Sequence, residues 1–146
     1  MKTLEGLQWH QQYNEHMGCL IDPRYRTGLP AYDVWADALE TGRANRDGEA
    51  YINQVWLECR EMAVEFLVEA KTRLPGVCDA AFDESIEHYT VVHDKLRMLS
   101  ELYPERPDQW DWQTTFAGPE GAQLVREAAQ AEREGVVCLK QIAKAL

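Results

Sequence analysis

The strongest constraint on the fold is a pair of long segments, residues 49–74 and 79–103, with only a short break between them. Apolar residues recur in both segments at spacings of three and four, which is the period of an amphipathic α-helix. Pro75 and Gly76 interrupt this pattern, and Asp79 is a suitable N-cap for the second helix. Because helices joined by so short a turn run antiparallel, the sequence predicts a long antiparallel helical hairpin at the centre of the fold.

Three further helices are expected around the hairpin, at residues 4–17, 30–41 and 119–145. Prolines stand in the first turns of the last two helices, where a missing backbone N–H costs little. The chain shows no internal repeat and no convincing strand. A length of 146 residues is enough to bury one hydrophobic core. We therefore expect an all-α fold, a bundle of about five helices that forms a single domain over residues 1–146.

The chain is acidic, with 25 Asp and Glu residues against 15 Lys and Arg residues and a formal net charge of -10. This charge would repel the phosphate backbone of a nucleic acid, and no cluster of basic residues offers a local exception. No apolar run approaches the roughly 20 residues that span a bilayer, and no basic leader precedes an apolar stretch. We expect a cytoplasmic protein that binds neither nucleic acid nor membrane.

Motifs for metal, cofactor or catalytic chemistry are not found in the sequence. The four cysteines are widely scattered: Cys19, Cys59, Cys78 and Cys138. Without CxxC or Cys/His spacing, they are expected to be reduced and mostly buried thiols rather than zinc ligands. Glu84 and His88 can share a ligand on one helix face, but the Glu-x-x-His motif of di-iron bundles is absent. Nucleophile elbows, phosphate-binding glycine loops and dinucleotide motifs are absent too, so we expect no metal, no cofactor and no catalysis.

Helix 49–74 carries two apolar stripes. The main stripe, which we expect to face the core, consists of Ile52, Val55, Trp56, Cys59, Ala63, Phe66, Ala70 and Leu74. The second stripe, roughly 100° away around the helix, consists of Leu57, Val64 and Val68. Helix 79–103 has its own second stripe, made of Val91, Met98 and Leu102. Unless the short helix and the loops cover these surfaces, they favour a homo-oligomer, a dimer or a tetramer.

Two polar residues interrupt apolar stripes, His93 on helix 79–103 and Glu132 on the last helix. A buried carboxylate is costly unless a cation or hydrogen-bond donor accompanies it. The two residues can therefore form a satisfied pair, face a ligand as an acid–base couple, or lie at stripe edges that reach solvent. With nearby aromatic residues they make a candidate lining for a small amphipathic or cationic molecule. This lining comprises Trp35, Trp56, Tyr89, His93 and Glu132.

Four glutamates form an acidic ridge along helix 49–74. They are Glu58, Glu61, Glu65 and Glu69. Such a ridge commonly serves to keep a helix face solvated. The alternative is that it attracts a cationic ligand or partner, because a surface of one sign concentrates counter-ions.

Several segments resemble a known helical module. They are residues 28–39, 49–52, 56–60, 63–67, 80–82, 87–89 and 99–104. Over residues 28–146 the chain is similar to the helical C-terminal region of cysteine-peptidase-like proteins of the butirosin-biosynthesis H type. The resemblance implies a helical bundle, with the catalytic cysteine expected in a papain-like part that this chain lacks.

The sequence as a whole favours a non-catalytic, self-associating helical protein that binds a small amphipathic or cationic molecule in an aromatic and acidic pocket. Two alternatives remain. The first is a protein–protein interaction module accessory to an enzyme. The second is an enzyme in which His93 and Glu132 act as an acid–base pair.

Overall fold

The computed structural model describes residues 26–106, 108 and 111–146, so the helix expected at residues 4–17 lies outside the described residues. The described part of the chain is mostly helical. Its elements are α2 (Pro30–Glu40), β1 (Ala44–Asn45), α3 (Arg46–Arg73), α4 (Asp79–Leu102), β2 (Thr115–Phe116) and α5 (Pro119–Ala145). These four helices begin and end within about three residues of the predicted positions. None of the helices described is long and apolar enough to cross a membrane.

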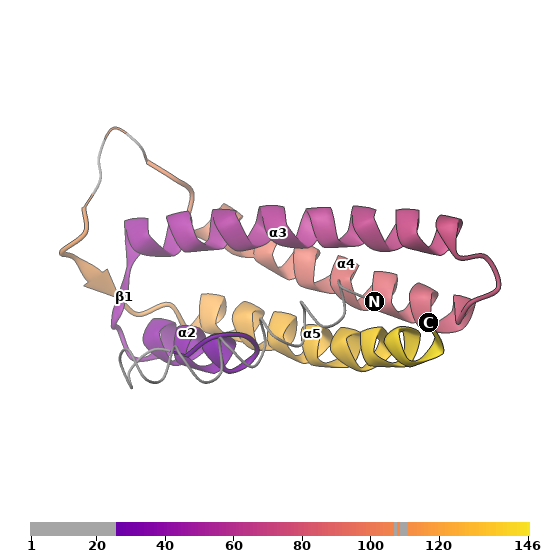
Figure 1. The fold of residues 1–146 in the computed structure, drawn as a ribbon. Helices are drawn as coiled ribbons and strands as arrows, with labels where there is room; N and C mark the ends of the chain where they lie inside the picture. The colour runs from indigo at the N-terminus through magenta and orange to yellow at the C-terminus, as the bar shows by residue number, and fades with distance from the viewer. Residues whose placement is uncertain (1–25, 107, 109–110) are drawn as a thin grey trace.

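The three long helices lie side by side, with α4 packed against α3 and against α5 (Figure 1). Contacts from α3 to α4 pair the start of one with the end of the other, as when Asn53 Nδ2 donates to the Leu96 carbonyl. Along α4 and α5, His88 lies beside Glu134 and the later Lys95 pairs with the earlier Glu127. Both α3–α4 and α4–α5 are therefore antiparallel. The short helix α2 runs along the first half of α5. Both α4 and α5 therefore have helices on two sides.

The start of α3 is set by Asn45, whose side-chain oxygen accepts a hydrogen bond of 2.8 Å from the backbone N–H of Gly48. This N-cap places the first residue of α3 at Arg46, three residues before the predicted start. At the other end Gly76 has a φ of 78°, in the left-handed region that glycine adopts without strain. The break expected at Pro75 and Gly76 is confirmed.

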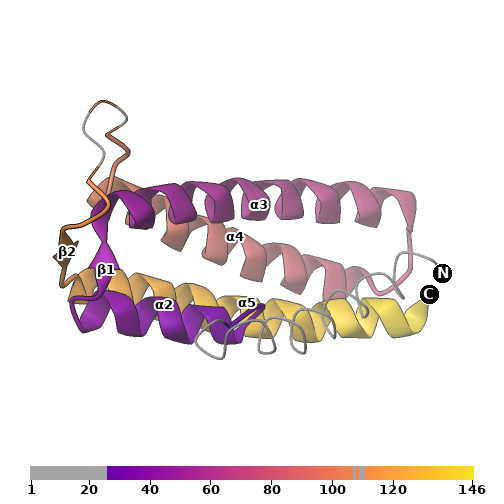
Figure 2. The ribbon, with the colours of Figure 1, turned by 60° about the vertical axis from the view of Figure 1, so that its left-hand side comes forward.

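Two short strands, which the sequence did not predict, join the α2–α3 junction to the segment before α5. They pair antiparallel, with Ala44 opposite Phe116 and Asn45 opposite Thr115. Figure 2 shows both strands at the same end of the bundle. The side chain of Asn45 also donates to the carbonyls of Asp111 and Thr114. Strands of two residues carry no detectable alternation, which is why the pattern missed them. We call this pair of strands the clasp.

The core consists of two hydrophobic clusters along the bundle. The first lies between α2, α4 and α5 and includes Leu39, Val92, Leu96, Leu99 and Val125, all fully buried. The second lies toward the other end and includes Leu67, Phe82, Tyr89 and Ile142. The alanines of α5 in the first cluster have small side chains, which lets α4 and α5 pack closely.

Candidate functional site

A buried ion pair joins three of the helices. The carboxylate of Glu132 on α5 is only 8% exposed. Arg60 on α3 donates to both of its oxygens, from Nε at 2.8 Å and from Nη2 at 2.7 Å. The hydroxyl of Tyr32 on α2 donates to the same carboxylate at 2.5 Å. This bidentate geometry, with a third donor, is the arrangement in which a buried carboxylate is fully satisfied.

Aromatic rings enclose this pair. Tyr32 lies edge-on to Trp56, with ring centroids 4.7 Å apart, and Trp35 lies 5.6 Å from Trp56. The guanidinium carbon of Arg60 lies 4.8 Å from the centre of the Trp56 ring, in a cation–π contact. Arg60 therefore already fills the position that a cationic ligand would take between Trp56 and Glu132.

Burial and charge keep Tyr32, Tyr89 and Arg60 in their ordinary protonation states at neutral pH. Burial raises the pKa of Tyr32, and the charge of Glu132 raises it further. Burial and then the same charge raise the pKa of Tyr89 to about 12. Burial opposes the charge on Arg60, but Glu132 outweighs burial and raises the pKa of the guanidinium. None of these three side chains is therefore close to exchanging a proton at neutral pH.

The satisfied pair of His93 with Glu132, one of the three possibilities that the sequence left open, is not formed. His93 is half-buried on α4, and its Nδ1 lies 3.4 Å from a carboxylate oxygen of the adjacent Asp94. The cation that satisfies Glu132 is Arg60, which lies 72 positions away along the chain. The sequence does hold one indication that Arg60 belongs to this region. Arg60 follows Trp56 by four residues, so the two side chains share a helix face. Of the five candidate residues, Trp35, Trp56, Tyr89 and Glu132 belong to one region, and His93 stands apart from it.

A second polar cluster lies beside the first. Trp35 Nε1 donates to Glu49 Oε2 at 2.5 Å, and Glu49 is 5% exposed. Burial raises the pKa of Glu49 to about 7, although the hydrogen bond from Trp35 acts in the opposite direction. Within the described part of the chain, Glu49 Oε1 and Asn53 Oδ1 are both buried without a hydrogen-bond partner. Sequence reasoning missed this carboxyl because acidic residues are common in the first turn of a helix.

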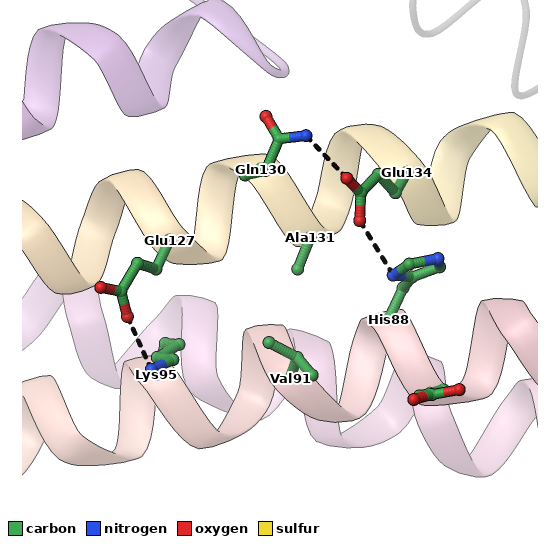
Figure 3. A pocket seen from close by; sticks show the side chains of 8 residues that line it. His88, Val91, Lys95, Glu127, Gln130, Ala131 and Glu134 are labelled. Atoms are coloured by element: carbon green, nitrogen blue, oxygen red, sulfur yellow. Dashed lines mark hydrogen bonds and ion pairs between the residues drawn. The ribbon is translucent and has the colours of Figure 1, made fainter.

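A shallow groove of about 420 Å³ lies between α4 and α5 (Figure 3). Val91 and Ala131 lie between two ion pairs in this view. Lys95 pairs with Glu127 at 2.6 Å, and His88 lies 3.4 Å from Glu134. Lys95 and Glu127 thus offset each other's charge across the groove. Over residues 26–106, 108 and 111–146, no cluster of three or more His, Cys, Asp or Glu residues is suited to hold a metal ion.

The most exposed apolar surface lies on α3. We call it the α3 seam, and it consists of Ile52, Val55, Cys59, Met62 and Phe66. Met62 and Phe66 are the most exposed of these, at 69% and 67%. Successive members are separated by three, four, three and four residues, so they share one face of the helix.

This seam shows that α3 is rotated about its axis from the expected orientation. Ile52, Val55, Cys59 and Phe66 were predicted to face the core, yet all four are exposed. The residues of α3 and its C-cap that pack against the two core clusters come from both predicted stripes. They are Trp56, Ala63, Ala70 and Leu74 of the main stripe and Leu57 and Val64 of the second. Val68 of the second stripe is exposed. On α4 the second-stripe residues Val91 and Met98 are exposed, whereas Leu102 packs against the core.

Comparison with protein-family models, with curated proteins and with solved structures finds no match. A functional interpretation therefore rests on the contacts and surfaces of the described residues.

Proposed function

We propose that this chain is a non-catalytic helical interaction module whose binding surface is the α3 seam. The observation that carries this proposal is the run of five exposed apolar side chains from Ile52 to Phe66. Their spacing is that of the a and d positions of a heptad, the pattern by which one helix packs against another. Single exposed apolar residues are ordinary, but a continuous stripe of this length commonly marks an association surface.

The buried polar cluster supports binding rather than catalysis. A general acid or base needs an accessible group whose pKa lies near neutrality. Arg60, Tyr32 and Glu132 instead satisfy one another, and the only histidine expected beside Glu132 contacts Asp94. An ion pair of this kind fixes how α2, α3 and α5 sit together, which a rigid binding surface requires.

Binding of a small cationic molecule at Trp35, Trp56, Tyr89, His93 and Glu132 stays a prediction. Such a ligand would have to displace Arg60 from its contacts with Trp56 and Glu132. Because that displacement leaves a buried charge unpaired, we place this function second. The resemblance to the helical region of cysteine-peptidase-like proteins likewise stays a prediction, and it is compatible with an interaction module.

Self-association is an alternative use of the same surface, because a heptad seam is complementary to its own copy. A dimer through α3, or a tetramer built from two such dimers, would bury Met62 and Phe66.

The experiment measures the mass of the full chain by light scattering from about 5 to 200 μM, a range that brackets micromolar affinity. It also measures binding of an amphipathic helical peptide with a leucine seam and neutral glutamine flanks. We expect the chain either to associate with a second copy or to bind the peptide. The double variant Met62→Ser/Phe66→Ser should abolish that association without loss of helicity. Met98→Ser, an exposed apolar residue of α4, is the matched control. A chain that stays monomeric and binds no such peptide would overturn the proposal.

A further inference from the structure

The two margins of the α3 seam differ in character. On one side the surface continues through Trp56, Ala63 and Ala70, which are half-buried and apolar. On the other side runs the acidic ridge of Glu58, Glu61, Glu65 and Glu69, and all four of these glutamates are exposed. A helix that packs along the seam therefore meets apolar surface at one edge and carboxylates at the other.

Most of this ridge lacks a cation of its own. Glu69 pairs with Arg73 one turn later, and Glu58 accepts a hydrogen bond from Gln54. Among the described residues, no basic side chain forms an ion pair with Glu58, Glu61 or Glu65. Some acidic residues elsewhere on the surface pair with a basic residue of another helix. Examples are Glu40 with Arg126, Asp33 with Arg133 and Glu127 with Lys95.

We propose that the α3 seam binds a basic amphipathic helix of a partner protein, with an apolar stripe flanked on one side by Lys or Arg. This inference rests on the proposed function of the seam and names the chemistry of its partner. The apolar stripe of the partner covers Ile52, Val55, Cys59, Met62 and Phe66. Its basic flank lies along Glu58, Glu61 and Glu65, where complementary charges select partners and speed association.

A second copy of the chain fits this surface less well than a basic helix does. Each copy carries a net charge of -10 and its own ridge of unpaired carboxylates. In an antiparallel pairing of two α3 helices the ridges lie against each other, and like charges across such a seam are destabilising. A basic flank turns the same positions into opposite-charge pairs.

The test uses the full chain and two fluorescent helical peptides of about four heptads. Both peptides have the same leucine seam, but one has lysine and the other glutamate at the flanking positions. By anisotropy at low ionic strength, we expect the lysine peptide to bind at least about tenfold more tightly, because three exposed charge pairs add small energies together. Salt should reduce this preference, since the charges are exposed.

Charge reversal and thiol protection locate the binding site. Glu58→Lys/Glu61→Lys/Glu65→Lys should invert the preference, so that the glutamate peptide binds better. The control Glu87→Lys/Glu105→Lys/Asp108→Lys makes the same change in net charge at exposed positions off α3 and should keep the lysine preference. Bound lysine peptide should also protect Cys59, which is exposed within the seam, from a maleimide, as read by mass spectrometry.

The outcomes separate this inference from the proposed function. If both peptides bind equally and charge reversal changes nothing, the acidic ridge does not select a basic partner. The inference then fails, and the seam remains a binding surface. If neither peptide binds and Phe66→Ser halves the mass of the particle measured by light scattering, a second copy occupies the seam and the inference fails. If neither peptide binds and the chain is a monomer, both proposals fail.

Discussion

Glu49 should make this protein less stable as the pH rises toward neutrality. Its carboxyl has an ordinary pKa of 4.5, and burial raises that pKa to about 7 in the folded protein. The folded state thus holds the Glu49 proton more tightly than the unfolded state does. The resulting stability is fully present below pH 4.5 and is lost as the pH rises through 7. At about 1.4 kcal/mol for each tenfold change in proton affinity, the loss is about 3 kcal/mol.

The variant Glu49→Gln isolates this effect. A glutamine keeps the acceptor for Trp35 Nε1, cannot ionise, and brings an amide donor toward the unpartnered Asn53 Oδ1, four residues along the same helix. We expect the free energy of unfolding of the variant to exceed that of the wild type by about 3 kcal/mol at pH 8, and this difference should vanish near pH 4.5. Exposed Glu61→Gln should leave the stability profile unchanged.

Urea denaturation followed by tryptophan fluorescence, repeated from pH 4.5 to 8, measures the free energy of unfolding for each variant. Other titrating groups are common to the wild type and to Glu49→Gln, so the difference between the two profiles reports Glu49 alone. Two parallel profiles would refute the reasoning, because they would mean that Glu49 ionises in the folded protein as readily as in the unfolded chain.

Three further substitutions test the packing by the same measurement. Arg60→Met should lower the free energy of unfolding by about 3–5 kcal/mol, because it leaves Glu132 buried without its cation. Adding Glu132→Gln should restore much of that loss. A loss below about 1 kcal/mol would mean that water already solvates the carboxylate. Gly135→Ala should destabilise by about 1 kcal/mol, because its new Cβ would lie 2.9 Å from Tyr89 Cε2. Tyr89→Leu should remove that penalty, and a Gly135→Ala variant that gains stability would contradict the close packing. Asn45→Ala should cost about 0.5–2 kcal/mol through the lost N-cap of α3, and an unchanged free energy of unfolding would show that the cap is dispensable.

The positions of the helices were predictable because they depend on local signals. The break at Pro75 and Gly76 and the proline that opens α5 act within a few residues of themselves, and the structure follows them. The orientation of α3 was not predictable in this way. Both of its stripes are apolar, so periodicity alone allows either one to face the core. The face that packs inward combines residues of both stripes, and it depends on the fit against α4, which is a matter of packing between distant segments.

In the candidate site too, local signals were predictable from the sequence and contacts between distant segments were not. Glu132 was predicted to lie within an apolar stripe of its helix, either buried or at an edge that reaches solvent, and it is buried. Its partner was not predictable by the same means. The spacing of Arg60 from Trp56 places both on one face of α3, but it does not show that this face meets Glu132 on α5. The pairing arises only when α3 and α5 are brought together around α4. Long-range contacts of this kind leave little trace in one sequence.

The clasp has a consequence for the order in which this fold forms. Its pairing of Ala44 with Phe116 closes a loop that includes all of α3 and α4, whereas contacts such as Lys71 with Asp83 close a short one. Closing the longer loop costs more chain entropy unless the intervening helices have already packed. The clasp therefore belongs to the last stage of folding. Weakening it should speed unfolding and leave the folding rate nearly unchanged, so that the clasp contributes to the lifetime of the native state.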